Sequence, residues 1–360
     1  MKEGYLLLED GVVFPGWFPT EALEGEGEVV FNTSMTGYQE IVTDPSYAGQ
    51  ILVFCYPQIG NYGVNQQDKE SERLFLNGVI TGEQCIEPSH FRSTNTFTNY
   101  LLSNGIPTLT GVDTRVLVKH IRDHGVMKGK LLLEKPLQAS TYEWKDQSSL
   151  VHDVSTTSYQ HYEGDGAHVV VLDFGCKKSI LHLLQQSRLK VTVVPYDTSE
   201  ADIRALCPDG LVLSNGPGDP QELSFLFSTI RNLVEDYPTF GICLGHQLLG
   251  LAYGAKTRKL SFGHRGSNHP VQELETGKVW MTAQNHGYEI VPETLAGTPF
   301  HSHFVHLHDG SIEGMKHRYK PITSVQFHPE AHAGPTDTSH LFNGFTDMLQ
   351  KGESSYYAIP

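Results

Sequence analysis

The chain has 360 residues and a formal net charge of −15, from 26 basic and 41 acidic side chains. This acidic balance argues against a nucleic-acid or anionic-membrane surface as its main task, and no apolar run approaches the roughly 18–20 residues that cross a bilayer. Apolar residues make up 39 % of the chain, which is typical of a globular protein, and the length favours two domains.

The first residues and the cysteines indicate a reducing compartment. Residues 1–10 combine a short apolar stretch with several acids, unlike a signal peptide. The five cysteines are odd in number and scattered, which is typical neither of a disulfide framework nor of a zinc cluster. We therefore expect a cytoplasmic protein with no nucleic-acid or membrane partner.

Short predicted strands, separated by Gly, Pro and Asp turns, occupy the first half at residues 4–9, 28–32 and 50–56. Residues 112–122 carry apolar side chains three and four positions apart, which predicts an amphipathic helix. This half therefore contains both strands and helix, without a repeat.

The second half alternates apolar runs with helical patterns. Strands are predicted at 168–175, 190–195, 210–214 and 238–243, and a helix at 179–186. Continuous Val-rich runs indicate strands buried on both faces, as in a parallel sheet, so we expect an α/β domain. A polar, glycine-containing stretch at 159–167 precedes it. We place the domains at 1–166 and 167–360.

A cysteine flanked by glycines follows the last of these strands. In Gly241-Ile242-Cys243-Leu244-Gly245, the strand ends in Gly-x-Cys-x-Gly and leads into a helix, the cysteine counterpart of a nucleophile elbow. The turn is so tight that the residues two before and two after the nucleophile must be small. The positive end of the helix stabilises negative charge on the sulfur. The alternative, a buried structural thiol, is disfavoured by the spacing of the glycines.

A candidate base lies in His328-Pro329-Glu330. Pro329 disfavours a helical conformation for His328, so we expect an extended segment there. Residues two apart in such a segment point to the same side, which lets Glu330 lie beside His328. A carboxylate in that place fixes the imidazole tautomer and stabilises its cation, which is the third role in a catalytic triad.

Residues 214–220, Ser-Asn-Gly-Pro-Gly-Asp-Pro, follow another predicted strand. Taken alone they predict a turn. Their glycines also let backbone N–H groups approach a ligand closely, as an oxyanion hole requires. Gly216 and the backbone amide of Leu244 are the candidate pair of donors.

The histidine-rich run 301–308 suggests a metal site at first sight. In a strand, His301 and His303 share one face while His306 and His308 share the other, so these four side chains cannot converge. We therefore predict a partly exposed strand there and no metal site in the chain.

Taken together, these motifs resemble those of class I, triad-type glutamine amidotransferases. Residues 214–220, 241–247 and 283–287 are similar, more narrowly, to the small, glutamine-hydrolysing subunits of carbamoyl-phosphate synthases. Residues 27–40, 43–47 and 112–115 extend the resemblance to the first half, which other amidotransferases lack. The implied fold is a small-subunit-specific α/β domain followed by an amidotransferase domain with a mainly parallel central sheet.

The resemblance also implies the site residues. The family's nucleophile falls on Cys243, and His328 and Glu330 complete the triad. Family contacts to L-glutamine fall on Ser46, Gly216, Gly218, Leu244, Gln247, Asn285, Gly287 and Tyr288. Tyr288 replaces a phenylalanine that is common in the family, and Ser46 comes from the first domain.

The implied activity is the hydrolysis of glutamine to glutamate and ammonia. Ammonia would pass to a large subunit, which makes carbamoyl phosphate from bicarbonate and ATP for arginine, pyrimidines or both. The chain has no Gly-x-x-x-x-Gly-Lys-Ser/Thr phosphate loop. We therefore expect no cofactor in this chain, ATP and a divalent metal on the large subunit, and a heterodimer or an oligomer of heterodimers.

Two other interpretations stay open. One is an amidotransferase subunit for another acceptor, as in anthranilate or guanylate synthesis, against which residues 1–160 argue. The other is a non-catalytic scaffold that has lost the triad, against which Cys243, His328 and Glu330 argue.

Overall fold

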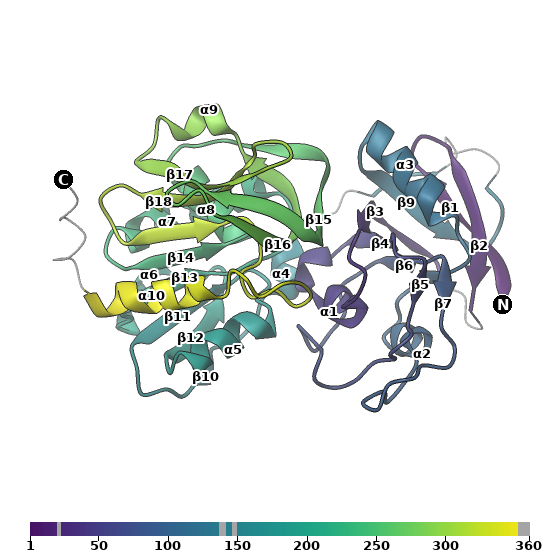
Figure 1. The fold of residues 1–360 in the computed structure, drawn as a ribbon, viewed down its shortest axis with the longest axis horizontal. Coiled ribbons are helices and arrows are strands. Elements are labelled where there is room, and N and C mark those ends of the chain that lie inside the picture. Colours follow the sequence, from purple (N-terminus) through teal and green to yellow (C-terminus); the bar gives the residue numbers. More distant parts are fainter. Residues whose placement is uncertain (20–22, 137–141, 146–149, 352–360) are drawn as a thin grey trace. The chain divides into compact units, whose positions relative to one another are not determined.

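The computed structural model describes residues 1–19, 23–136, 142–145 and 150–351, and the chain divides into two units, Met1–Ser148 and Ser149–Pro360 (Figure 1). Each unit is built around its own sheet. None of the helices in these described ranges is both long and apolar enough to span a membrane.

The first unit contains a seven-stranded mixed sheet in the order β2-β1-β9-β3-β4-β6-β8. Strands β3, β4, β6 and β8 run parallel to one another, whereas β1 pairs antiparallel with β2 and β9. The strands of this sheet are β1 (Lys2–Leu8), β2 (Val13–Phe18), β3 (Gly25–Asn32), β4 (Gln50–Phe54), β6 (Gly78–Ile80), β8 (Thr108–Leu109) and β9 (Met127–Leu132). Two short strands, β5 (Gln58–Ile59) and β7 (Glu83–Gln84), pair with each other separately.

The helices of this unit are α1 (Tyr38–Thr43), the 3₁₀ turn η1 (Pro45–Tyr47), α2 (Phe97–Ser103) and α3 (Thr114–His124). Helix α3 confirms the predicted amphipathic helix, two residues later than expected. Its start is fixed by Asp113, whose side chain accepts a hydrogen bond from the Val116 N–H. Leu117 and Ile121, four residues apart, are its buried apolar positions.

The second unit contains a ten-stranded sheet in the order β10-β12-β11-β13-β14-β19-β18-β17-β15-β16. Its strands are β10 (Gln160–Tyr162), β11 (His168–Asp173), β12 (Lys190–Pro195), β13 (Gly210–Leu213), β14 (Thr239–Ile242), β15 (Thr257–Glu273), β16 (Val279–Ile290), β17 (Phe300–His306), β18 (Ile312–His317) and β19 (Ile322–Val325). The stretch from β12 to β19 is parallel, as predicted, and antiparallel strands extend it at both edges.

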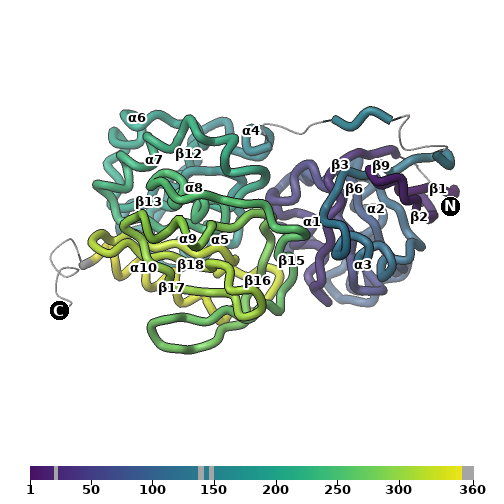
Figure 2. Tube along the Cα trace, turned by 90° about the horizontal axis from the view of Figure 1, so that it is seen from above, coloured from purple at the N-terminus to yellow at the C-terminus, as the bar shows by residue number. Residues whose placement is uncertain are grey.

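Helices cover both faces of this sheet. Successive residues of a strand point to opposite sides, and in β11 both sets are apolar. Val170 and Leu172 pack into the core beneath α6, α7 and α8, whereas Val169 and Val171 pack beneath α5 and α10. The helices are α4 (Leu150–Val154), α5 (Lys178–Gln186), α6 (Glu200–Ala205), η3 (Pro220–Leu226), α7 (Phe227–Val234), α8 (Leu244–Ala252), α9 (Pro292–Leu295) and α10 (His340–Lys351). Figure 2 traces the long β15–β16 hairpin in green.

The division between the units falls earlier than the predicted boundary at residue 166. The polar stretch used to place that boundary contains β10, which pairs antiparallel with β12 of the second sheet. Val151 of α4 is likewise buried in the core of the second unit. Polarity indicated a linker here, but residues 160–162 form an edge strand, which has one side exposed and tolerates polar side chains.

Candidate active site

Four neighbouring parallel strands of the second sheet lead to the predicted site. The chain leaves β11 toward Lys177, β13 toward Gly216, β14 into Cys243 and β19 toward His328. Parallel strands place their carboxyl ends at one edge of the sheet, where α/β proteins bind ligands. The strand order therefore brings together residues that lie far apart in the sequence.

Cys243 occupies the sharp turn between β14 and α8. Its backbone has φ 52° and ψ −102°, and its N–H donates to the Val325 carbonyl at 2.8 Å. A Cβ at Gly241 would lie 2.6 Å from Leu249 Cδ1, and one at Gly245 would overlap the Leu213 carbonyl oxygen. The two glycines are thus required sterically, as the sequence indicated.

The side chain of His328 is aligned by Glu330, which in turn pairs with Lys177. His328 Nδ1 donates to Glu330 Oε1 at 2.6 Å, and Lys177 Nζ lies 3.0 Å from the same carboxylate oxygen. Lys177 is only 2 % exposed and also donates to the Ala331 carbonyl at 2.7 Å. Within the described chain, His328 Nε2 makes no hydrogen bond, which leaves that atom to exchange a proton.

Glu330 reaches His328 through a turn and not through the extended segment we expected. The Ala331 N–H donates to the His328 carbonyl at 3.1 Å and closes this turn around Pro329. His328 itself still pairs as an isolated bridge with Ala283, to whose carbonyl its N–H donates at 2.9 Å.

Electrostatics keep this buried pair charged. Burial lowers the pKa of His328, but the Glu330 carboxylate and the nearby Cys243 sulfur outweigh burial and raise that pKa to about 10. Burial raises the pKa of Glu330, but Lys177 and then His328 lower it to about 2. The site is therefore built to hold an imidazolium against a carboxylate.

Gln326 is a further polar neighbour of the cysteine that the sequence analysis missed. Its Nε2 donates to Cys243 Sγ at 3.6 Å, and its Oε1 accepts from Gln247 Nε2 at 3.0 Å. Gln326 and His328 both follow β19, and the signal in the sequence was only this adjacency. The amide fixes the sulfur and Gln247 relative to each other.

The glycine-rich loop and the start of α8 lie against each other. A Cβ at Gly216 would overlap the Phe174 carbonyl oxygen and lie 2.8 Å from Leu244 Cδ2. Gly218 has φ +91°, a conformation that favours glycine. Gly216 and Leu244, the predicted oxyanion donors, are therefore neighbours in the fold.

Strand β16 brings the remaining predicted glutamine contacts of this unit. The Asn285 carbonyl accepts from Cys243 Sγ at 3.7 Å, and the Tyr288 carbonyl accepts from Gln247 Nε2 at 3.0 Å. Gly287 lies between them on the same strand. These are contacts within the chain, and the contacts of Asn285, Gly287 and Tyr288 with the substrate glutamine stay predictions.

Ser46 belongs to the first unit. It lies in η1, and its N–H donates to Asp44 Oδ1 at 2.9 Å. Its predicted contact with glutamine stays a prediction.

Comparisons with known proteins match both halves of the chain. Residues 170–348 match the glutamine amidotransferase class-I family, and residues 6–131 match the CPSase domain of the carbamoyl-phosphate synthase small chain. A carbamoyl phosphate synthase arginine-specific small chain from Halalkalibacterium halodurans is 46 % identical over 359 residues, which are 99 % of this chain and 100 % of the relative.

Two further relatives align over almost their whole length. An arginine-specific small chain from Geobacillus stearothermophilus is 48 % identical over 98 % of this chain and 99 % of its own. A pyrimidine-specific small chain from Halalkalibacterium halodurans is 47 % identical over 97 % of both chains.

Proposed function

This chain belongs to the carbamoyl phosphate synthase small-chain family, and on that premise we propose that Cys243, His328 and Glu330 hydrolyse L-glutamine for the synthesis of carbamoyl phosphate. The observation that carries the proposal is the strained elbow of Cys243 beside a buried His–Glu–Lys series. A cysteine with only a structural role would not need this strained turn.

In the first half of the reaction, the Cys243 thiolate attacks the side-chain carbonyl carbon of glutamine. The backbone N–H groups of Gly216 and Leu244 stabilise the oxyanion. His328 gives its Nε2 proton to the leaving nitrogen, the carbon–nitrogen bond breaks, and ammonia leaves a thioester on the sulfur.

In the second half, His328 takes a proton from water, which attacks the thioester carbon. The carbon–sulfur bond breaks and glutamate leaves. The imidazolium of His328 and the thiolate of Cys243 are then restored as an ion pair. Glu330 holds the imidazole in the tautomer that exposes Nε2, and Lys177 holds Glu330 ionised.

Glutamine contacts complete the proposal. In the second unit we assign Gly216, Gly218, Leu244, Gln247, Asn285, Gly287 and Tyr288, and from the first unit Ser46. The geometry around Cys243 supports the assignments of Asn285 and Gln247, whose contacts converge on the sulfur or on Gln326.

We assign ammonia as the product that passes to a large subunit, where ATP, bicarbonate and a divalent metal would react. The two chains would form a cytoplasmic heterodimer or an oligomer of heterodimers, together a ligase for arginine or pyrimidine synthesis. The support is the relatives' own description as small chains. Hydrolysis by Cys243 itself uses no cofactor.

The test is Cys243→Ala in the enzyme assembled with its large subunit. We expect loss of glutamine-dependent carbamoyl phosphate synthesis and retention of ammonia-dependent synthesis, because only the first needs the thiolate. Cys207→Ala, which changes an exposed cysteine of the same unit, is the matched control and should retain both activities. Loss of both activities in correctly assembled Cys243→Ala would refute the assignment of Cys243 as the nucleophile.

A further inference from the structure

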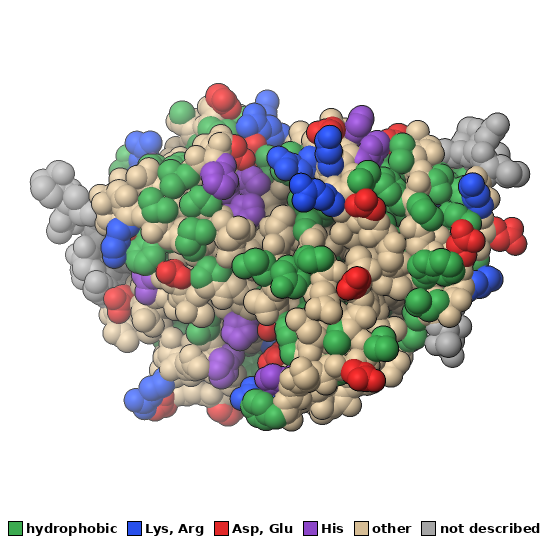
Figure 3. Space-filling model, turned by 45° about the vertical axis from the view of Figure 1, so that its right-hand side comes forward, with side chains coloured by type: hydrophobic (Ala, Val, Ile, Leu, Met, Phe, Trp, Pro, Cys, Tyr) green, Lys and Arg blue, Asp and Glu red, His purple; other side chains and the backbone are tan. Residues whose placement is uncertain are grey.

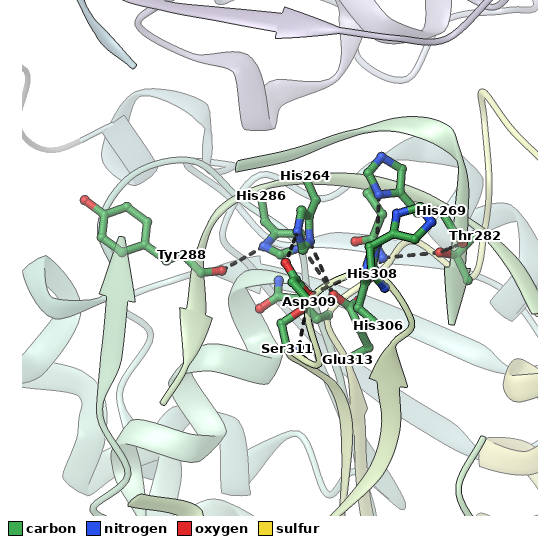
Figure 4. A network of polar contacts seen from close by, with 12 residues as sticks. His264, His269, Thr282, His286, Tyr288, His306, His308, Asp309, Ser311 and Glu313 are labelled. Atoms are coloured by element: carbon green, nitrogen blue, oxygen red, sulfur yellow. Dashed lines mark hydrogen bonds and ion pairs between the residues drawn. The ribbon is translucent and has the colours of Figure 1, made fainter. Parts of the chain in front are cut away.

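A group of histidines lies in the same unit, and none of them is among the residues assigned above to glutamine hydrolysis. His264 and His269 belong to β15, and His306 ends the neighbouring β17. The pairing of Val271 with His306 sets these strands in register. Figure 4 shows the imidazoles gathered with Asp309 and Glu313, and one ligand atom from each of the three histidines lies within 4.8 Å of the others.

This grouping changes the conclusion drawn from the histidine-rich run. The four histidines of that run do not converge: His303 Nε2 contacts Glu273 Oε1 at 3.2 Å, whereas His306 Nδ1 lies 3.5 Å from Asp309. His306 instead meets histidines of another strand. The spacing of residues within one strand does not reveal ligands that a neighbouring strand supplies.

The spacing of two imidazole nitrogens suits a tetrahedral metal ion. His269 Nδ1 and His306 Nε2 are 3.0 Å apart. Zinc–nitrogen bonds of about 2.0–2.1 Å at tetrahedral angles place two ligand nitrogens about 3.3 Å apart. A small rotation of the two rings would therefore convert this contact into a pair of metal bonds.

His264 is oriented so that one nitrogen is left for a ligand. Its Nε2 donates to Asp309 Oδ2 at 2.8 Å, while its Nδ1 makes no hydrogen bond within the part of the chain that is described. The imidazole is almost fully buried. A carboxylate that holds the far nitrogen of an imidazole is the usual support of a metal-binding histidine.

Charge in this region also favours a cation. Glu313 is 0 % exposed and lies 3.5 Å from His264 Nδ1 and 3.7 Å from His286 Nε2. All ion pairs of Asp309 and Glu313 within the described ranges are with histidines, and none is with Lys or Arg. A divalent ion among neutral imidazoles would balance these two carboxylates.

A hydrogen-bonded network without metal accounts for part of the arrangement. The His308 N–H donates to His306 Nδ1 at 3.2 Å, which leaves His306 Nε2 to donate to His269. This metal-free network leaves His264 Nδ1 and His286 Nε2 without hydrogen bonds among the described residues, although both atoms are buried. Metal binding satisfies the first of these. With Nε2 on the metal, His306 Nδ1 would carry the proton and face Asp309 Oδ1, 3.5 Å away, and would no longer accept from the His308 N–H.

We propose that His264, His269 and His306 bind one Zn²⁺ ion, with Asp309 orienting two of the imidazoles and the fourth position open to water. Imidazole is a preferred ligand of zinc, and half-buried His269 gives the ion a path from solvent. The ion would fasten β15 to β17, next to the edge strand β16. The proposal does not depend on glutamine hydrolysis.

The test uses the full chain purified without a histidine tag and stripped with a chelator. Zinc is titrated in competition with a chromophoric chelator, and bound metal is counted after dialysis. We expect one zinc per chain, and at least a tenfold weaker affinity in His269→Asn and in His306→Asn. Cobalt in the unsubstituted chain should give the visible absorption of a four-coordinate ion.

His301→Asn is the matched control, because this half-exposed histidine of β17 lies outside the group. It should bind zinc as the unsubstituted chain does, and circular dichroism should show all three variants folded. The proposal is overturned if the unsubstituted chain takes up no stoichiometric zinc and its cobalt form shows no such absorption. It is equally overturned if folded His269→Asn and His306→Asn bind zinc undiminished, or if His301→Asn loses it.

Discussion

Cys243 adopts a backbone conformation that a residue other than glycine takes only at a cost, of order 1–3 kcal/mol. The cost is tolerated because the neighbouring strand holds its N–H and because Gly241 and Gly245 let β14 and α8 approach. In return, the sulfur lies beside the Gln326 amide and the Asn285 carbonyl. Strain at this residue therefore serves to present the sulfur that we propose as the nucleophile.

Lys177 keeps the carboxylate of Glu330, the partner of His328, ionised. Glu330 is fully buried, and burial alone would raise its pKa from 4.5. Lys177 contributes the largest lowering effect on that pKa. Because the folded pKa, about 2, is below the unfolded value, the stabilisation by Glu330 is present above pH 4.5 and lost as the pH falls toward 2.

We predict that Lys177→Met lowers the free energy of unfolding by about 3–5 kcal/mol, since it leaves a buried carboxylate with less compensation. Glutaminase activity should fall, and the acidic limb of its pH profile should shift to higher pH because the pKa of Glu330 rises. Denaturant unfolding and kcat/KM across pH measure the two effects.

Lys178→Met is the control for this change, because Lys178 is adjacent but exposed. Its pH profile should match that of the unsubstituted chain. An unshifted acidic limb in Lys177→Met would show that the ammonium does not set the ionisation of Glu330.

At the scale of elements, the site depends on how closely α8 lies against β13. The Gly245 N–H donates to the Ser214 carbonyl at 3.1 Å, so the first turn of the helix is tied to the loop that follows β13. This contact places Leu244 against Gly216. The distance between helix and strand therefore sets the spacing of the two proposed oxyanion donors, Gly216 and Leu244.

We predict that Gly245→Ala destabilises the chain by about 1–3 kcal/mol, the usual range for overpacking. The added methyl would overlap the Leu213 carbonyl and push α8 outward. The kcat for glutamine hydrolysis should fall at least tenfold, because misplacement by about 1 Å can cost on the order of a hundredfold. Thermal unfolding and steady-state glutaminase assays measure both.

Gly344→Ala is the matched control, because no atom lies within 4 Å of the added methyl on α10. Its stability should stay equal or rise by up to about 1 kcal/mol, as for an exposed helical glycine. Full activity in Gly245→Ala would contradict the view that the spacing of α8 and β13 sets the donors.

At the scale of the whole molecule, the first unit is a compact unit distinct from the one that carries Cys243. It carries its own mixed sheet and its own buried core, around Val30, Leu52 and Val79. On the face drawn in Figure 3, most acidic and basic side chains are scattered among polar and apolar ones, and histidines reach the surface in small groups. We proposed above that the first unit supplies Ser46 to glutamine.

We predict that Ser46→Ala raises the KM for glutamine by about tenfold and changes kcat less. One neutral hydrogen bond contributes about 1–1.5 kcal/mol, and a contact made equally in the ground and transition states affects KM. Steady-state kinetics of the assembled enzyme measure both constants. Ser103→Ala, at an exposed helix end of the same unit, should leave them unchanged; equal KM values in all three proteins would refute the contact.

Local physics in the sequence determined much of this protein. The Val-rich runs gave the parallel strands, because strands buried on both faces need continuous apolar residues. The spacing of Gly241 and Gly245 around Cys243 gave the elbow, because only small residues fit a turn so tight. The order of the motifs then identified the family, which the comparisons confirm.

The tertiary structure alone decided which distant residues meet. Lys177 lies beside Glu330, and His306 beside His264 and His269, because the strand order of the sheet places their loops and strand ends together. Polarity misplaced the domain boundary, because pairing of β10 with β12 depends on a partner far along the chain. Periodicity reports which face of an element is buried, whereas contacts across a sheet depend on the order in which strands assemble.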